Sequence, residues 1–252
     1  MKSVRRFDGK VTDYDRYRER YAPDVLLPIL RQHCGLVPEW LIADVGAGTG
    51  MLADVFLSNG NPVVAVEPNA EMRDTCTELH RGMTLTIVDG IAEQTGLPDH
   101  SVDLVTAGRA MHWFDPERSM AEFRRILKSD GWIAIIALGR TEKGREENIL
   151  LEQLLRQFSP EHADTHAGYS IYRSLETYLT RDLYRREILS SMKLDWEALH
   201  GMVMSLSHAP SREADNYAAF ETALRSLYEG YASNGSFVLE SRYWINIGRL
   251  PR

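Results

Sequence analysis

Through the first 140 residues, short apolar runs alternate with segments in which apolar residues recur every three or four positions. The apolar runs, rich in Val and Ile, occupy residues 41–45, 62–66, 84–88, 102–107 and 132–137. Their length and composition are typical of buried strands, and the periodicity between them is typical of helices with one buried face. Strands that alternate with helices predict a doubly wound, Rossmann-like α/β fold with a largely parallel sheet.

The chain beyond residue 140 has a different pattern. Residues 142–183 form a long helical stretch, which the polar segment 159–170 interrupts. A strand near residues 186–194, two further helices and a closing strand over residues 236–247 follow. We therefore predict a seven-stranded sheet, mostly parallel with an antiparallel last strand, and a helical insertion.

We expect one domain that spans residues 1–252, because the helical stretch reads as an insertion and no internal repeat is present. Its expected parts are an N-terminal helical lid (1–36), a core that carries the first five strands (37–140), a helical cap insertion (141–181) and the C-terminal part of the sheet with its helices (182–252).

Composition limits the classes of function. The 252 residues are 44% hydrophobic and 26% charged, which suits one globular domain. The formal net charge of -7 argues against a nucleic-acid partner, because such proteins normally carry a surplus of Lys and Arg. The apolar runs are too short to cross a membrane, and two cysteines make no disulfide framework. We therefore expect a cytoplasmic protein without a membrane partner.

The stretch "IADVGAGTG" places Gly46, Gly48 and Gly50 directly after the first strand, which carries Asp44 near its end. Glycines in a turn between strand and helix let the backbone approach a bound nucleotide closely. The dinucleotide fingerprint needs its third small residue one position after Gly50, where this chain has Met51. The turn therefore does not favour a pyrophosphate.

Acidic residues end the next two predicted strands. Glu67 follows "VVAV", at the sheet edge where a carboxylate can hold the two hydroxyls of a ribose. Asp89 ends the third strand, where it can accept a hydrogen bond from an exocyclic amine. The three strand ends together favour an adenosine-like ligand.

Four stretches resemble the class I S-adenosylmethionine-dependent methyltransferases, and among these the small-molecule branch called methyltransferase type 11. They are "IADVGAGTG", "AVEPNAEM", "DGIAEQTGLPDHSVDLVTAGRAMHWFD" and "FRRILKSDGWIAII", which occur in family order. The N-terminal "YDRYRERYAP" and the later "GMVMSLSHAP" also look like family segments, so the resemblance extends over most of the chain. It implies a methyltransferase fold, S-adenosyl-L-methionine as the cofactor and a small-molecule methyl acceptor.

The resemblance also implies which residues bind the cofactor. From the methionine end to the adenine they are Ala107, Gly108, Asp44, Gly46, Ala47, Gly48, Glu67, Pro68, Met72, Asp89, Ile91 and Ala92. The first six belong to the methionine part, Glu67 to the ribose hydroxyls and the last five to the adenine.

The chain departs from its branch after the fourth strand, where it reads "GRAMHWF". Arg109 stands where the branch commonly has Gln. A guanidinium there can pair with the carboxylate of the cofactor or with an acidic substrate, or it can point to solvent. The Asn/Asp-Pro-Pro-Tyr/Phe motif of enzymes that methylate base or glutamine nitrogens is absent at this place, which favours a small-molecule acceptor.

His112 is our candidate catalytic residue, because it follows the fourth strand at the edge where the methyl group should lie. Alternatively, His112 and Trp113 pack against the following helix. Tyr14, Arg18 and Tyr21 lie on a leading helix, which either closes over the site or rests on the domain surface. We assign Tyr14, Arg18, Tyr21, Arg109 and Trp113 to the acceptor side.

Two other sets of residues do not predict a metal site or a catalytic triad. His162 and His166 lie four residues apart, but within a polar loop and without a third ligand, so no metal site is expected. Ser205, Ser207 and His208 lack the acidic partner of a hydrolase triad.

The expected function is methyl transfer from S-adenosyl-L-methionine to a small molecule, and O-methylation of a carboxylate or hydroxyl is one reaction that fits. Two alternatives stay open. One is a non-catalytic protein that binds the cofactor, and the other is a nicotinamide-dependent oxidoreductase.

Overall fold

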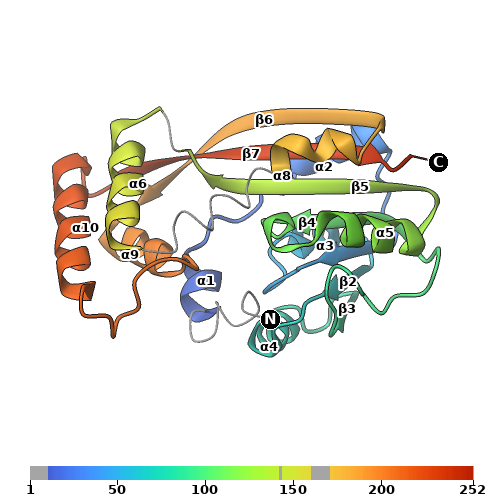
Figure 1. The fold of residues 1–252 in the computed structure, drawn as a ribbon, viewed down its shortest axis with the longest axis horizontal. Coiled ribbons are helices and arrows are strands. Elements are labelled where there is room, and N and C mark those ends of the chain that lie inside the picture. Colours follow the sequence, from blue (N-terminus) through green and yellow to red (C-terminus); the bar gives the residue numbers. More distant parts are fainter. Residues whose placement is uncertain (1–10, 142–143, 160–170, 252) are drawn as a thin grey trace.

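The computed structural model describes residues 11–141, 144–159 and 171–251. His162 and His166 lie outside the described residues. The described chain contains one seven-stranded sheet in the order β3-β2-β1-β4-β5-β7-β6 (Figure 1). In chain order the strands are β1 (Ile42–Val45), β2 (Val63–Val66), β3 (Leu85–Val88), β4 (Val102–Gly108), β5 (Leu127–Arg140), β6 (Arg181–Leu194) and β7 (Phe237–Arg249).

Pairing within the sheet confirms the predicted fold class. Strands β1 to β5 pair in parallel, whereas β7 runs antiparallel to both β5 and β6. The chain moves outward from β1 to β3 and then returns to β4 on the other side of β1. This reversal makes the carboxyl ends of β1 and β4 the place where doubly wound sheets bind ligands.

Two hydrophobic clusters cover the two faces of the sheet. On β5, Trp132, Ala134 and Ile136 belong to one cluster, and the intervening Ile133 and Ile135 belong to the other. This alternation is what the period of two in a strand requires. Helices α2 (Pro23–Cys34) and α3 (Ala53–Ser58) pack into the first cluster, and α5 (Pro116–Ile126) packs into the second. Helix α4 (Ala70–Leu79) joins β2 to β3.

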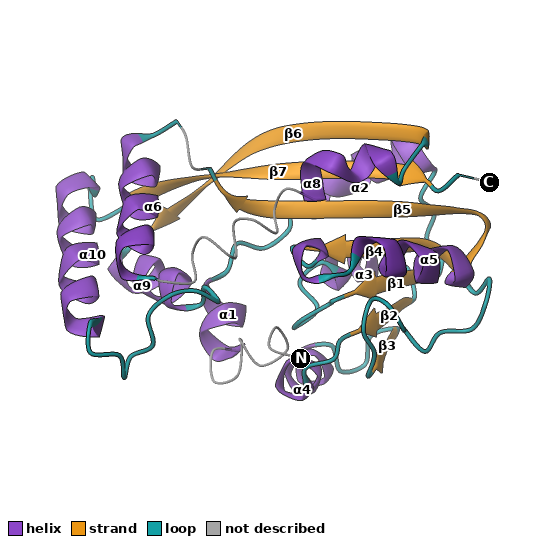
Figure 2. Cartoon of the chain, viewed as in Figure 1, coloured by secondary structure: helices purple, strands orange, loops and turns teal. Residues whose placement is uncertain are grey.

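A third cluster lies at one end of the long strands β5, β6 and β7, away from β1 to β3 (Figures 1 and 2). It joins α6 (Glu146–Phe158) to α9 (Trp196–Met204) and α10 (Tyr217–Tyr231). Each helix contributes buried side chains to this core, for example Leu155 of α6, Leu199 of α9 and Phe220 of α10. The cap therefore combines a helix of the segment 141–181 with two helices from the C-terminal part of the chain.

The N-terminal helix α1 (Val11–Tyr17) packs against α9. The ring of Tyr17 lies directly on Gly201, where a Cβ atom would clash with it. The Tyr17 hydroxyl donates a hydrogen bond of 2.8 Å to the carboxylate of Glu197. These contacts attach the leading helix to the cap and not only to the sheet. None of the helices in the described ranges has the length and hydropathy that crossing a bilayer requires.

Candidate functional site

A cavity of about 100 Å³ opens at the carboxyl ends of β1, β2 and β4, where the strand order reverses. Its lining residues are Tyr14, Gly46, Gly48, Glu67, Pro68, Asn69, Met72, Gly108, Arg109, Ala110, Trp113 and Phe114. Most of them come from the stretches that the sequence analysis singled out. Tyr14 belongs to α1, so the leading helix contributes to this cavity.

The glycine turn has a different neighbour at each glycine. All three glycines have positive φ, namely 69° at Gly46, 59° at Gly48 and 90° at Gly50. A Cβ atom on Gly46 would lie 2.7 Å from the Cβ of Ala110, and one on Gly50 would lie 2.5 Å from the Cε1 of His80. A Cβ atom on Gly48 would meet only the sulfur of Met72, at 4.0 Å. Gly48 is therefore the glycine that leaves open space on the cavity side.

Glu67 ties the end of β2 to the glycine turn. Its Oε2 accepts a hydrogen bond of 2.9 Å from the amide of Gly48, and its Oε1 accepts one of 2.9 Å from the amide of Asn69. Burial of this carboxylate raises its pKa, and the two amides oppose that shift. Each carboxylate oxygen keeps a second lone pair, with which it can accept a hydroxyl proton.

Asp44 lies fully buried beneath the turn, and neither carboxylate oxygen has a hydrogen-bond partner in the described part of the chain. Burial raises the pKa of Asp44 to about 7, and the nearby carboxylate of Glu67 adds to this shift. A buried carboxylate without a partner is costly, so a cationic group beside it would stabilise this arrangement. Asp44 and Ala47 do not line the cavity themselves.

The residues after β3 lie elsewhere. Asp89 is exposed and forms two parallel hydrogen bonds of 3.1 Å with the guanidinium of Arg73, which also donates to the backbone oxygen of Glu67. Ile91 is exposed, and Ala92 is buried in the core. None of these three predicted adenine-edge residues lines the cavity, so their role stays a prediction.

Backbone and side chains after β4 form the opposite wall. Gly108 lines the cavity, whereas Ala107 is buried in the second cluster. A Cβ atom on Gly108 would lie 2.8 Å from the hydroxyl of Tyr21, which is itself buried behind this wall. Burial raises the pKa of Tyr21, so its hydroxyl stays protonated. Trp113 lines the cavity as well.

Arg109 has an uncommon backbone conformation for a residue other than glycine, with a φ of 53°. Its Nη2 lies 3.0 Å from the sulfur of Met51, and its Cζ lies 5.0 Å from the ring centroid of Tyr21. The buried Nε has no hydrogen-bond partner among the described residues. Arg109 lines the cavity, and its guanidinium packs against Met51 and Tyr21.

His112 lies just outside the cavity, in the short turn η2 (Met111–Trp113). Its Nδ1 lies 3.2 Å from the hydroxyl of Tyr172, and the two rings are tilted against each other. Burial lowers the pKa of His112 to about 3, and the positive charge of Arg18 acts in the same direction. The imidazole is therefore neutral at physiological pH, but a pKa this low also makes it a weak proton acceptor.

Arg18 is also outside the cavity, because its side chain points to the cap. Its Nε donates a hydrogen bond of 2.9 Å to the hydroxyl of Ser205, and its Nη2 donates one of 3.3 Å to the backbone oxygen of Ser205. Ser205 thus contacts the residue that directly follows α1.

Sequence reasoning did not select Asn69, Ala110 or Phe114, although all three line the cavity. For Asn69 a signal existed, because Asn directly before a helical segment is typical of an N-cap. Its Oδ1 accepts a hydrogen bond of 3.0 Å from the amide of Met72.

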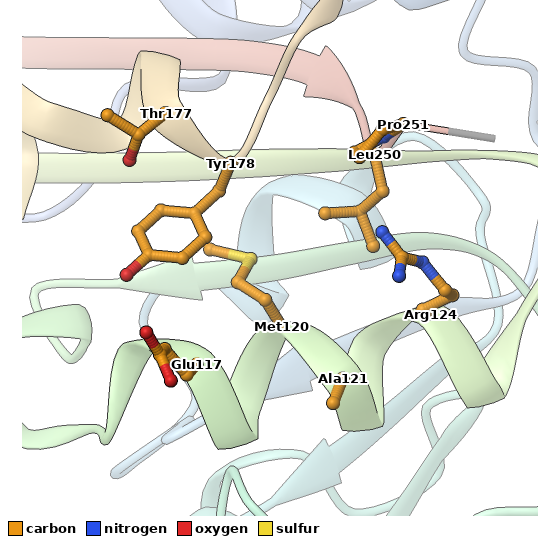
Figure 3. Close-up of a pocket in the computed structure, with 8 residues that line it drawn as sticks. All are labelled: Glu117, Met120, Ala121, Arg124, Thr177, Tyr178, Leu250 and Pro251. Atoms are coloured by element: carbon orange, nitrogen blue, oxygen red, sulfur yellow. The ribbon is translucent and has the colours of Figure 1, made fainter.

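A second cavity, of about 250 Å³, lies away from the glycine turn, between α5, the segment at Thr177 and Tyr178, and the C-terminal Leu250 and Pro251 (Figure 3). The end of the Met120 side chain lies beside the ring of Tyr178 (Figure 3). None of the strand-end carboxylates or turn glycines reaches this cavity, so its size alone does not make it the reaction site.

Comparison with known proteins agrees with this geometry. Residues 43–135 match the model of a family described as a methyltransferase domain. An uncharacterised methyltransferase of Mycobacterium tuberculosis is 36% identical over 141 residues, which are 54% of each chain. The match thus covers about half the length of this curated relative. An uncharacterised methyltransferase of Schizosaccharomyces pombe is 27% identical over 195 residues, or 72% of this chain and 76% of that one.

Solved structures share the fold over nearly the whole chain. A candidate type II methyltransferase from Anaeromyxobacter dehalogenans superposes with a TM-score of 0.64 at 25% identity, and the match covers 94% of this chain and 100% of that one. The YcgJ protein from Bacillus subtilis gives a TM-score of 0.53 at 20% identity, over 89% and 98% of the two chains, which shows the fold alone. Together with the sheet order, these matches show a class I methyltransferase fold, with a methyltransferase domain over residues 43–135.

Proposed function

We propose that this protein binds S-adenosyl-L-methionine in the cavity beside the glycine turn and transfers its methyl group to a small molecule. The observation that carries the proposal is the buried carboxylate of Glu67, which the amides of Gly48 and Asn69 hold at the cavity wall. A carboxylate held in this way suits a ribose diol and would repel a phosphate.

The residues of the site fit the cofactor. Gly46 and Gly48 line the cavity, and Gly48 leaves open space there for the methionine part of the cofactor. The buried Asp44, whose carboxylate oxygens have no hydrogen-bond partner among the described residues, offers a negative charge to the ammonium group. Pro68 and Met72 line the cavity beyond Glu67, on the side that would receive the adenine. When bound, S-adenosyl-L-methionine supplies a methyl group that its sulfonium makes electrophilic.

The main contribution of the protein would be positioning. Correct alignment of reacting groups is able to lower a barrier by about 7 to 11 kcal/mol. Tyr14 lines the cavity, and Asp15 on the same helix accepts a hydrogen bond of 3.1 Å from the hydroxyl of Thr49 in the glycine turn. The leading helix thus supports the turn and shields the cavity from water.

The chemistry of the acceptor decides whether a base is needed. A carboxylate acceptor is already ionised, whereas a hydroxyl must lose its proton as the new O–C bond forms. His112 lies next to cavity-lining Trp113 and is neutral at physiological pH, so it is our candidate for accepting this proton. This role requires that the bound acceptor raise the low pKa of His112 as negative charge develops on the acceptor oxygen. We propose O-methylation of a carboxylate or hydroxyl on this basis, with Trp113 and Tyr14 against the acceptor.

Calorimetric titration with S-adenosylhomocysteine tests the proposal. The native protein should bind this product and should not bind reduced nicotinamide dinucleotide. Glu67→Gln should weaken binding by about tenfold or more, because the ribose loses a charged acceptor. Glu78→Gln, on the exposed end of α4, is the matched control and should leave the affinity unchanged. Nicotinamide binding in place of S-adenosylhomocysteine would contradict the proposal.

A panel of small carboxylic acids and hydroxyl compounds then separates an enzyme from a protein that only binds the cofactor. Methyl transfer to any of them should depend on Glu67. Tight binding of S-adenosylhomocysteine with no turnover across the panel would favour the non-catalytic alternative.

A further inference from the structure

Arg109 is a partly buried cation, and the negative charge of Glu19 acts on it without forming an ion pair. It makes no ion pair among the described residues, and its guanidinium instead has the sulfur of Met51 and the ring of Tyr21 as neighbours. A thioether sulfur is a weak acceptor, whereas a guanidinium carries five donors that match a carboxylate in a two-pronged geometry. The positive φ of Arg109 is a strained conformation, and strain of this kind is common where a side chain is aimed at a ligand.

The position of Arg109 in the cavity indicates which part of the proposed cofactor it would contact. Among the described residues that line the cavity, Arg109 is the one Arg or Lys. Its guanidinium contacts Met51, which directly follows Gly50, and the cavity wall also includes Gly46 and Gly48. Arg109 therefore lies at the end of the cavity that the glycine turn lines, where we place the methionine part. Glu67, Pro68 and Met72 line the part that we assign to the ribose and the adenine.

Opposite charges flank one side chain in this region. The hydroxyl of Tyr21 experiences the positive charge of Arg109 and the negative charge of Asp44. The methionine end of S-adenosyl-L-methionine carries an ammonium and a carboxylate on the same carbon atom. The buried carboxylate of Asp44 and the partly buried guanidinium of Arg109, whose charges both act on Tyr21, are complementary to such a pair of charges.

We propose, on the basis of the proposed function, that Arg109 binds the carboxylate of the methionine end of S-adenosyl-L-methionine. Two N–H donors of the guanidinium would then bind the two carboxylate oxygens, in place of the contact with Met51. Arg18 is less suited to this role, because Ser205 on the cap already accepts hydrogen bonds from its Nε and Nη2. Arg109 thereby selects a cofactor with an intact amino-acid end.

Two ligands that differ only in the carboxylate test this assignment. Affinities for S-adenosylhomocysteine and for its decarboxylated analogue, which keeps the ammonium, are measured by calorimetry. The native protein should bind S-adenosylhomocysteine about 10- to 100-fold more tightly than the analogue. Arg109→Gln should lose this preference, with weaker binding of S-adenosylhomocysteine and an unchanged affinity for the analogue.

Controls keep each outcome decisive. Arg81→Gln, on the surface, and Met51→Leu, which replaces the thioether by a branched hydrocarbon of similar size, should both retain the preference for the carboxylate. Equal native affinities for the two ligands would overturn the inference even if Arg109→Gln failed to fold. An Arg109→Gln protein with unchanged S-adenosylhomocysteine affinity and a raised KM for an acidic acceptor would overturn it in favour of an acceptor site. No native binding of S-adenosylhomocysteine would contradict the proposed function itself.

Discussion

The imidazole of His80 lies 2.8 Å from the carboxylate of Asp54 and presses against Gly50 of the glycine turn. Its Nδ1 lies 2.7 Å from the backbone oxygen of Cys76. Both neighbours of the ring nitrogens are acceptors, so the ring is best satisfied when both nitrogens carry protons. The hydrogen bond with Asp54 raises the pKa of His80 to about 10, and that with Cys76 adds to this effect.

The His80–Asp54 pair predicts a pH dependence of stability. The pKa of His80 in the folded protein lies above its ordinary value of 6.5, so the stabilising contribution is complete below pH 6.5 and is lost as the pH rises toward 10. Asp54→Asn should lower the free energy of unfolding by about 1.5 to 3 kcal/mol at pH 7. Urea unfolding of both proteins at pH 7 and pH 10 checks this, and a difference that stays constant over this range would contradict the assignment.

The glycines of the turn should separate stability from binding. Gly50→Ala should destabilise the fold by about 2 kcal/mol or more, because the new methyl group is strained at positive φ and collides with His80. Gly48→Ala should cost only about 1 kcal/mol, since its Cβ meets open space, but it should strongly weaken S-adenosylhomocysteine binding. Thermal unfolding and calorimetry on the two variants make the comparison. Equal losses of stability would show that Gly48 also has a packing role.

Local pattern was enough to predict most of the core. Strands β1 to β4 are short and mostly apolar, as is the predicted part of the longer β5, and Glu67 could be placed at the site because it directly follows β2. Asp89 follows a strand in the same way, yet it pairs with Arg73 on α4 at the surface. A sequence position identifies the sheet edge that a side chain can reach. It does not identify which neighbour pairs with that side chain, because such pairs depend on tertiary packing.

The cap was harder to predict for the same reason. Each of α6, α9 and α10 has an apolar face that the sequence shows, but their common core joins residues as distant as Leu155 and Phe220. The position of Tyr17 on Gly201 is another contact over a long sequence separation. Periodicity carries no information about which apolar faces meet, so the partner of α1 could not be predicted.

The contact between α1 and α9 predicts that Gly201→Ala destabilises the packing of α1, although alanine has a higher helix propensity than glycine. Gly201 lies inside α9, where replacement by Ala would ordinarily stabilise a helix by about 1 kcal/mol. Here the added methyl group would displace the ring of Tyr17, so Gly201→Ala should loosen α1. Hydrogen exchange of the α1 amides should become faster, while α9 keeps its protection. Unchanged exchange in α1 would show that Tyr17 does not pack on Gly201 in solution.

His112 leads to a prediction that also tests the class of acceptor. With a pKa of about 3, its ring stays neutral from pH 5 upward, so its own protonation should not limit turnover between pH 5 and pH 9. His112→Gln should lower kcat for a hydroxyl acceptor by about a hundredfold or more, because the proton of that hydroxyl loses its acceptor. The same variant should change kcat for a carboxylate acceptor by only a few-fold, since no proton is transferred.

Affinity for S-adenosylhomocysteine, measured by calorimetry on the native and His112→Gln proteins, separates the base from a packing role. The affinity of the His112→Gln protein for S-adenosylhomocysteine should equal that of the native protein, because His112 does not line the cavity. Tyr172→Phe removes the hydroxyl that lies next to Nδ1 of His112. This variant should also lower kcat for a hydroxyl acceptor, but by less than His112→Gln, since the imidazole remains and only its orientation is less restrained. If His112→Gln instead lowers cofactor affinity and slows both acceptor classes equally, then His112 supports the cavity wall through Trp113 and is not the base.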